Sequence, residues 1–157
     1  MTQSLENFMQ SPAAVPMDRP TGVDRLRSAA ACDSVIAGVV RVKNAGENRR
    51  WVRQPYDETI LLMPVELDGE TPAGPPVVVR GLDISMAGIS FAHDRPFAGR
   101  SFVAGLRDAF GNVQSLMVSL TWTRFENGGG YQSGGRFLRP SSLVLPPLAE
   151  WSECERA

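Results

Sequence analysis

The sequence is poor in the residues that build metal centres, disulfide frameworks and catalytic dyads. Its 157 residues include two cysteines, Cys32 and Cys154, and a single histidine, His93. A structural zinc site needs about four Cys or His ligands, and a disulfide framework needs closely spaced pairs of cysteines. We therefore expect no bound metal, no cofactor and reduced thiols, as in a cytoplasmic protein.

Long apolar runs and a charge imbalance are missing as well. No stretch approaches the roughly 20 residues of a membrane span, and the N-terminal region lacks the charged start and apolar core of a signal peptide. The formal net charge is -1, which argues against a nucleic-acid polymer as partner. We expect a protein that is not exported, does not insert into a membrane and binds neither DNA nor RNA.

Signatures of the common enzyme classes are absent too. There is no G-x-S-x-G, no Walker lysine, no H-E-x-x-H and no G-x-G-x-x-G between a strand and a helix. His93 stands in the turn-like HDRP, where a surface histidine is expected more often than a general base. The glycines at 128–130 and 134–135 are typical of a turn and a bulge. We expect no catalytic residues and no enzymatic activity.

Short apolar, β-branched and aromatic stretches recur from Pro55 onward and predict an all-β fold. The expected strands are 59–67, 77–85, 88–92, 100–107, 113–125 and 130–138. The segments between them are rich in Gly, Pro, Asp and Asn, as in tight turns. Six short, mainly antiparallel strands predict a small β-barrel or closed sandwich, which leaves few open strand edges.

The barrel is expected to have flanking segments at both ends. The predicted segments are a flexible tail over 1–20, a helix or linker over 21–46, the barrel over 47–140 and a C-terminal tail over 141–157. Apolar spacing predicts a helix over 22–44, although the β-branched run at 35–42 fits a strand almost as well. Leu148 and Trp151 lie at helical spacing and predict a short helix that docks on the barrel.

Arginine supplies almost all of the positive charge, since Lys43 is the only lysine among 16 Lys and Arg residues. The base composition of the genome would explain this bias equally well. Five basic residues and one acid lie within 41–53 and give this segment a local charge of +4. Such a segment is either a solvated loop or a site for an anionic partner.

Part of this segment has the spacing of a binding motif. Arg49 and Arg53 form R-x-x-x-R, with Arg50 beside the first. Residues four apart lie on one side of the chain, about 13 Å from each other when extended and about 6 Å on a helix. In either conformation two guanidinium groups can converge on one ligand.

A second motif, D-x-S-x-x-G, lies between two expected strands. Its members are Asp83, Ser85 and Gly88. The spacing puts the carboxylate and the hydroxyl on one face of a strand end, and the glycine permits a positive φ and a close backbone approach to a ligand. The same residues are also typical of a turn that only closes a hairpin.

In this order and spacing the motifs resemble the PilZ domain family. The residues that carry the resemblance are Arg49 and Arg53, then Asp83, Ser85 and Gly88, then MVSLTW ending at Trp122, then GGRF at 134–137. The resemblance covers about 48–140. It implies a small antiparallel β-barrel with an N-terminal helix or extended arm and a short C-terminal helix. Many PilZ domains are receptors for cyclic di-GMP, a bacterial second messenger with two phosphates and two guanines.

The resemblance also implies a ligand site. Its expected members are Arg49, Arg50, Arg53, Asp83, Ser85 and Gly88. Arginine forks fit phosphate oxygens or guanine O6 and N7, and the Asp83 carboxylate would accept N–H groups of a guanine. Ser85 would hydrogen-bond a phosphate or base, and Gly88 would leave room for the ligand. Trp122 is expected in the core, with stacking under a guanine as the alternative.

The function implied is that of a cyclic di-GMP receptor or adaptor. Binding would order the arginine-rich segment and re-pose the N-terminal helix for an unidentified protein partner. The alternative is a PilZ-type protein–protein interaction module without nucleotide binding. Asn48 stands where the family often has a further arginine, which leaves open whether one or two cyclic di-GMP molecules bind.

Overall fold

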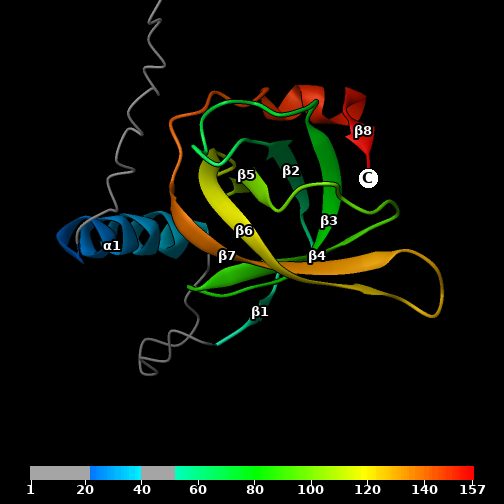
Figure 1. Ribbon diagram of the computed structural model, residues 1–157, viewed down its shortest axis with the longest axis horizontal. Helices are drawn as coiled ribbons and strands as arrows, with labels where there is room; N and C mark the ends of the chain where they lie inside the picture. Colours follow the sequence, from blue (N-terminus) through cyan, green and yellow to red (C-terminus); the bar gives the residue numbers. More distant parts are fainter. Residues whose placement is uncertain (1–21, 40–51) are drawn as a thin grey trace, which may run out of the picture.

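The computed structural model describes residues 22–39 and 52–157. Within these ranges a helix precedes a set of β-strands, and a short 3-10 helix lies near the end (Figure 1). The elements are α1 (Gly22–Val39), β1 (Gln54–Pro55), β2 (Thr59–Pro64), β3 (Val77–Ile84), β4 (Gly88–His93), β5 (Ser101–Arg107), β6 (Val113–Phe125), β7 (Tyr131–Pro140), η1 (Leu148–Glu153) and β8 (Glu155–Arg156). The tail expected over 1–20 lies outside the described residues.

Six of the strands close into an antiparallel β-barrel. Their hydrogen-bonded order is β3-β2-β5-β6-β7-β4, and β4 pairs with β3 to complete the circuit. β1 pairs with the end of β3, and β8 runs parallel to its start. All six strands expected from the sequence are present, and the expected small barrel is confirmed. The two-residue strands β1 and β8 were not expected.

The barrel interior is filled by side chains from all six strands, which alternate with outward-facing residues as a period of two requires. The completely buried members include Ile60, Leu62, Phe91, Phe102, Ala104, Leu106, Leu116 and Val118. Each large apolar side chain contributes about 1.5–3 kcal/mol through its burial. The barrel is therefore a packed core, and polar ligands can be bound only at its ends or on its outer wall.

Helix α1 packs against this core. Cys32, Ile36 and Val39 recur at helical spacing, are buried, and belong to the same apolar cluster as the barrel interior. The helix expected over 22–44 is present as Gly22–Val39, and residues 35–39 of the ambiguous run are helical. Residues 40–44 lie outside the described ranges. No helix within those ranges is long and apolar enough to cross a bilayer.

The C-terminal segment docks on the outer wall of the barrel, as the spacing of Leu148 and Trp151 predicted. Trp151 is buried against Leu61 of β2 and Val78 of β3. Its indole N–H donates a hydrogen bond of 2.9 Å to the carbonyl of Pro146. The outer face of β2 and β3 is thus covered here by η1.

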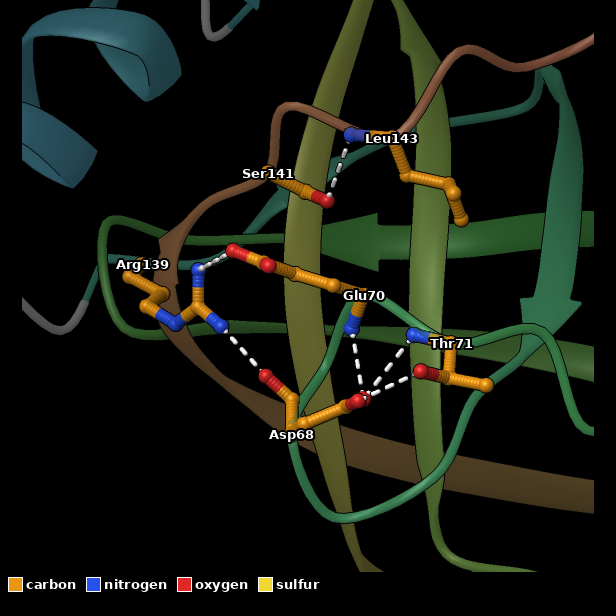
Figure 2. A network of polar contacts seen from close by, with 6 residues as sticks. All are labelled: Asp68, Glu70, Thr71, Arg139, Ser141 and Leu143. Carbon is orange, nitrogen blue, oxygen red and sulfur yellow. Dashed lines mark hydrogen bonds and ion pairs between the residues drawn. The ribbon is translucent and has the colours of Figure 1, made fainter.

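One aspartate organises the loop between β2 and β3 (Figure 2). The Asp68 carboxylate accepts a hydrogen bond from the Thr71 hydroxyl at 2.5 Å and from the backbone N–H groups of Glu70 and Thr71 at 2.9 Å each. Arg139 of β7 donates to the Asp68 carbonyl at 2.6 Å and pairs with Glu70. These bonds, led by that of the Thr71 hydroxyl, lower the pKa of Asp68 to about 2. A charged carboxylate therefore holds the turn above that pH.

His93 is buried, so the expectation of a surface histidine was wrong. Only 3% of the residue is exposed, because it is the last residue of β4 and faces inward, where its ring packs against those of Phe97 and Tyr131. Its Nδ1 lies 2.7 Å from the carbonyl of Arg95 and must donate, which leaves Nε2 to accept from Ser133 Oγ at 2.8 Å. Burial lowers the pKa of His93, and the Arg95 carbonyl partly opposes this shift.

We predict that His93 makes the stability of the barrel depend on pH near neutrality. Its pKa is lower in the folded protein than its ordinary value of 6.5, so the unfolded chain binds more protons between these two values. Stability is then full above about pH 6.5 and falls as the pH is lowered through the folded-state pKa. Because His93 is the only histidine, a proton NMR titration of tag-free protein measures its pKa directly. A value at or above 6.5 would contradict the buried neutral imidazole.

Candidate functional site

Strand β1 brings the end of the arginine-rich segment to the D-x-S-x-x-G motif. Pro55 pairs with Asp83, which places the preceding Arg53 at the end of β3. The Arg53 Nη1 and the Asp83 Oδ2 are 3.8 Å apart, and the side chains are 65% and 34% exposed. Two motif residues thirty positions apart in the sequence are therefore neighbours on the surface.

The chain just after Arg53 is fixed by Tyr56. Its ring is buried, and its hydroxyl accepts from the N–H of Arg107 at 3.0 Å and donates to the carbonyl of the same residue at 3.2 Å. Burial raises the pKa of Tyr56 to about 12, so the phenol keeps its proton. Gly81 lets the segment approach, because a Cβ there would lie 2.4 Å from the Tyr56 carbonyl oxygen. Arg53 therefore lies three residues before a side chain that is fixed in the fold, that of Tyr56.

Ser85 and Gly88 build the tight turn between β3 and β4. The Ser85 hydroxyl accepts from the backbone N–H groups of Ala87 and Gly88 at 3.2 and 3.3 Å, and its own N–H donates to the Gly88 carbonyl at 2.9 Å. Gly88 does not use the positive φ that glycine permits, since the described glycines with a positive φ are Gly69, Gly111, Gly129 and Gly130. Gly88 is needed instead for its approach to β7, where a Cβ would lie 2.1 Å from the carbonyl oxygen of Gly135.

A hollow of about 140 Å³ opens between these residues and the neighbouring strands. Its lining combines the described motif residues with residues of β4, β6 and β7, and includes Arg53, Asp83, Ser85, Gly88, Ser90, Thr121, Trp122, Gly134 and Arg136. Among the described lining residues the charged groups are two arginines and one aspartate, a net charge of +1. Sequence reasoning did not select Ser90, Thr121 or Arg136 for the site.

The strand register explains why these residues meet. Asp83 on β3 pairs with Ser90 on β4, Ser90 pairs with Gly134 on β7, and Gly134 pairs with Trp122 on β6. The four residues form one row across the outer wall of the barrel, because cross-strand partners lie on the same face. This outer row separates the site from the packed interior.

Trp122 lies on this outer wall, and the expectation that it packs in the core was wrong. Leu116, Val118 and Leu120 face inward, so strict alternation would turn residue 122 inward as well. A β-bulge between Leu120 and Trp122 reverses that order. The indole, 36% exposed, lies over Gly134, where an added Cβ would be 2.3 Å from Nε1. The alternative role, stacking against a base, stays a prediction.

The surroundings of Trp122 favour contact with flat or anionic groups. β6 continues past its last pair with β5, that of Ser119 with Ser101, and Trp122 lies in this extension, where β6 pairs with β7. Figure 1 shows the β6–β7 hairpin reaching away from the other strands. The guanidinium of Arg124 stacks over the indole at 5.5 Å from the ring centre. The bulge and the glycine turn expected from the sequence are both present, the turn with positive φ at Gly129 and Gly130.

A larger hollow of about 790 Å³ lies elsewhere, between the C-terminal segment and the tip of the β6–β7 hairpin. None of the predicted ligand residues that the structure describes, namely Arg53, Asp83, Ser85 and Gly88, lines it. Its charged lining consists of three arginines and three acids, namely Arg80, Arg107, Arg156, Glu58, Asp94 and Glu126. The formal charges of these six side chains cancel, whereas the described side chains of the smaller hollow carry a net charge of +1.

The smaller hollow can therefore offer guanidinium forks to an anion, a carboxylate to N–H donors and an indole to a flat ring. Of the predicted residues, Arg53, Asp83, Ser85 and Gly88 are brought together around it. Arg49 and Arg50 lie outside the described residues. The exposed ion pair of Arg53 and Asp83 contributes only about 0–1 kcal/mol, so a ligand can compete for both partners at small cost.

Comparisons with known proteins give one weak likeness. No protein-family model matches the chain, and no curated protein matches it either. Among solved structures, the Bacillus subtilis inhibitor of motility (MotI/DgrA) is similar to 61% of this chain and 44% of that one, at 11% sequence identity and a TM-score of 0.43. The aligned part is thus less than half of that protein's chain. A likeness of this size is no evidence of shared function.

We predict that Gly88→Ala destabilises the fold before it affects any ligand. The added methyl group would press on the Gly135 carbonyl, and overpacking of this kind costs about 1–3 kcal/mol. Gly99→Ala is the matched control, because no atom lies within 4 Å of its added Cβ and its φ is not positive. Urea denaturation measures both variants. Equal stability of Gly88→Ala and wild type would contradict the close approach of β4 and β7.

Proposed function

We propose that this chain is a PilZ-type receptor domain that binds cyclic di-GMP at the hollow beside Asp83. The observation that carries the proposal is the meeting of both sequence motifs, R-x-x-x-R and D-x-S-x-x-G, through Arg53 and Asp83 at the rim of one net positive hollow. The resemblance rested on the order and spacing of these motifs. Their closeness in space, with Arg53 and Asp83 3.8 Å apart, is a further observation that supports the proposal.

The chemistry of the site supports this ligand. A guanine presents two neighbouring N–H donors on its Watson–Crick edge, and the Asp83 carboxylate can accept both. Adenine has a single donor on that edge, its 6-amino group, beside the acceptor N1, so Asp83 favours guanine. Arg53 and Arg136 are exposed guanidinium groups that suit phosphate oxygens or guanine O6 and N7.

The size of the hollow supports the binding of one base in it. A volume of about 140 Å³ is close to the roughly 150 Å³ of a cavity that takes up benzene, and far below the roughly 300–1,000 Å³ of a pocket for a whole drug-sized molecule. One guanine would therefore enter, and the phosphates would lie over the rim. In this proposal Arg49 and Arg50 reach the phosphates from the segment before Arg53.

Ser85 and Gly88 act in this proposal mainly through shape. Ser85 Oγ accepts two hydrogen bonds, both from backbone N–H groups of the β3–β4 turn. Gly88 allows the backbone of β7 to lie close by, because it has no Cβ. The turn fixes the end of β3 and with it the Asp83 carboxylate. These two residues therefore set the geometry of the acceptor rather than supplying the main contacts.

We predict that wild-type protein binds cyclic di-GMP with a Kd in the micromolar range or below, about -8 kcal/mol, and does not bind GTP or cyclic di-AMP measurably in the same range. Arg53→Ala and Asp83→Ala should each weaken binding about 10- to 100-fold, because each removes hydrogen bonds to a charged group. Isothermal titration calorimetry measures all three ligands on each variant.

Arg95→Ala is the matched control for Arg53→Ala. Arg95 is 68% exposed, pairs with a single carboxylate, that of Glu155, and does not line the hollow. Its removal should leave the affinity unchanged. Wild-type binding that survives Arg53→Ala and Asp83→Ala would show that the site is elsewhere, and no binding by wild type would contradict the receptor function.

We further predict that cyclic di-GMP slows the amide hydrogen exchange of residues 41–54. The proposed contacts of Arg49, Arg50 and Arg53 would tie this segment to the ligand, and the order gained there can re-pose α1. Exchange mass spectrometry with and without ligand measures the effect, with the loop at 141–147 as an internal reference. Unchanged protection at saturating ligand would contradict the conformational output.

A further inference from the structure

Ser90 carries a buried hydroxyl without a partner. Among the described residues, its Oγ is the buried side-chain polar atom that makes no hydrogen bond, and only 4% of the residue is exposed. Buried hydroxyl groups in folded proteins nearly always have a partner, since a missing one costs free energy. Such an atom on the wall of a hollow points to a ligand.

The position of Ser90 in the outer row brings its side chain next to Asp83. The two residues are direct cross-strand partners of β4 and β3, so their Cβ atoms are about 4.5–5.5 Å apart on one face. Ile89 and Phe91, the neighbours of Ser90 along β4, are buried in the barrel core. Alternation therefore turns Ser90 outward, toward the hollow.

A comparison of Ser85 with Ser90 shows which of the two hydroxyl groups is still able to form hydrogen bonds. Ser85 Oγ accepts two backbone N–H groups, and the Gly88 carbonyl lies 3.5 Å away as its acceptor. Ser90 Oγ has neither a donor nor an acceptor in the described structure. The sequence motif points to Ser85 as a ligand contact, but the hydrogen bonds show that the Ser90 hydroxyl is the one available to a ligand.

We infer that Ser90 is a specificity-determining residue of this site, whose hydroxyl donates to O6 of a guanine while Asp83 accepts the N1–H and 2-amino groups. This inference rests on the function proposed above. O6 lies beside N1–H on the Watson–Crick edge, so neighbouring groups of the base would meet neighbouring side chains of the row. Together the two residues read an acceptor followed by two donors, a pattern that adenine lacks.

The indole of Trp122 stands next to this contact. It lies over Gly134, the partner of Ser90 on β7. Trp122 and Ser90 both line the hollow, so a base that enters beside Ser90 can pack against the indole. The guanidinium of Arg124 stacks on the same ring, 5.5 Å from its centre.

The test compares Ser90→Ala with wild type for affinity and for stability. We expect cyclic di-GMP binding to weaken about five- to tenfold, the value of one hydrogen bond. The midpoint of thermal unfolding should stay the same or rise, because alanine removes an unsatisfied buried hydroxyl. Ser115→Ala, at a half-buried strand position outside the hollow, is the control and should leave affinity unchanged.

Cyclic di-IMP separates the roles of the two side chains, because hypoxanthine keeps O6 and N1–H but lacks the 2-amino group. Ser90→Ala should weaken both cyclic dinucleotides by the same factor. A loss confined to cyclic di-GMP would place the hydroxyl on the 2-amino group and contradict the assignment.

The outcomes distinguish this inference from the proposed function. If wild type binds and Asp83→Ala weakens binding about 10- to 100-fold while Ser90→Ala has no effect, the inference about Ser90 is wrong and the receptor function stands. If Ser90→Ala loses affinity together with several degrees of thermal stability, its role is structural and the inference is again wrong. If wild type does not bind cyclic di-GMP, both are wrong.

Discussion

Closure of the barrel depends on a backbone contact that only glycine permits. Gly88 at the start of β4 lies so near Gly135 of β7 that a Cβ would come within 2.1 Å of its carbonyl oxygen. Ser85 holds the preceding turn through hydrogen bonds to two backbone N–H groups. The turn lets β4 pair with both β3 and β7 and thereby joins the two ends of the sheet. The first role of the D-x-S-x-x-G motif is therefore structural, because Ser85 and Gly88 allow the barrel to close.

The same closure creates the candidate site. It lines up Asp83, Ser90, Gly134 and Trp122 across four strands on the outer wall, while the interior stays packed with apolar side chains. Gly134 in this row has no side chain, and the indole of Trp122 occupies the space where a Cβ would be. The exposed Arg53, directly before β1, contributes a cation that is only weakly paired. The proposed ligand would therefore meet residues that the fold already holds in place.

Much of the fold followed from the sequence, because β-branched runs bounded by Gly, Pro and Asp mark strands by local physics alone. β1 and β8 have two residues each and carry no periodicity to detect. Trp122 was misplaced because one extra residue in β6 reverses the alternation. His93 looked like a turn residue although it ends β4 and faces inward. Arg53 and Asp83 were found through their motifs, whereas Ser90 has no motif and is marked only by strand register and a missing hydrogen bond.

Chemical-shift mapping of isotope-labelled protein with cyclic di-GMP addresses the location of the site and the identity of the ligand together. The structure leads us to expect shifts in the backbone amides of 83–90 and 134–136 and in the indole N–H of Trp122, which surround the hollow of about 140 Å³. Amides near Arg107 and Arg156, at the larger hollow, should stay unchanged. Shifts centred on that larger hollow, or no shifts at millimolar ligand, would contradict a cyclic di-GMP site on the outer wall of this barrel.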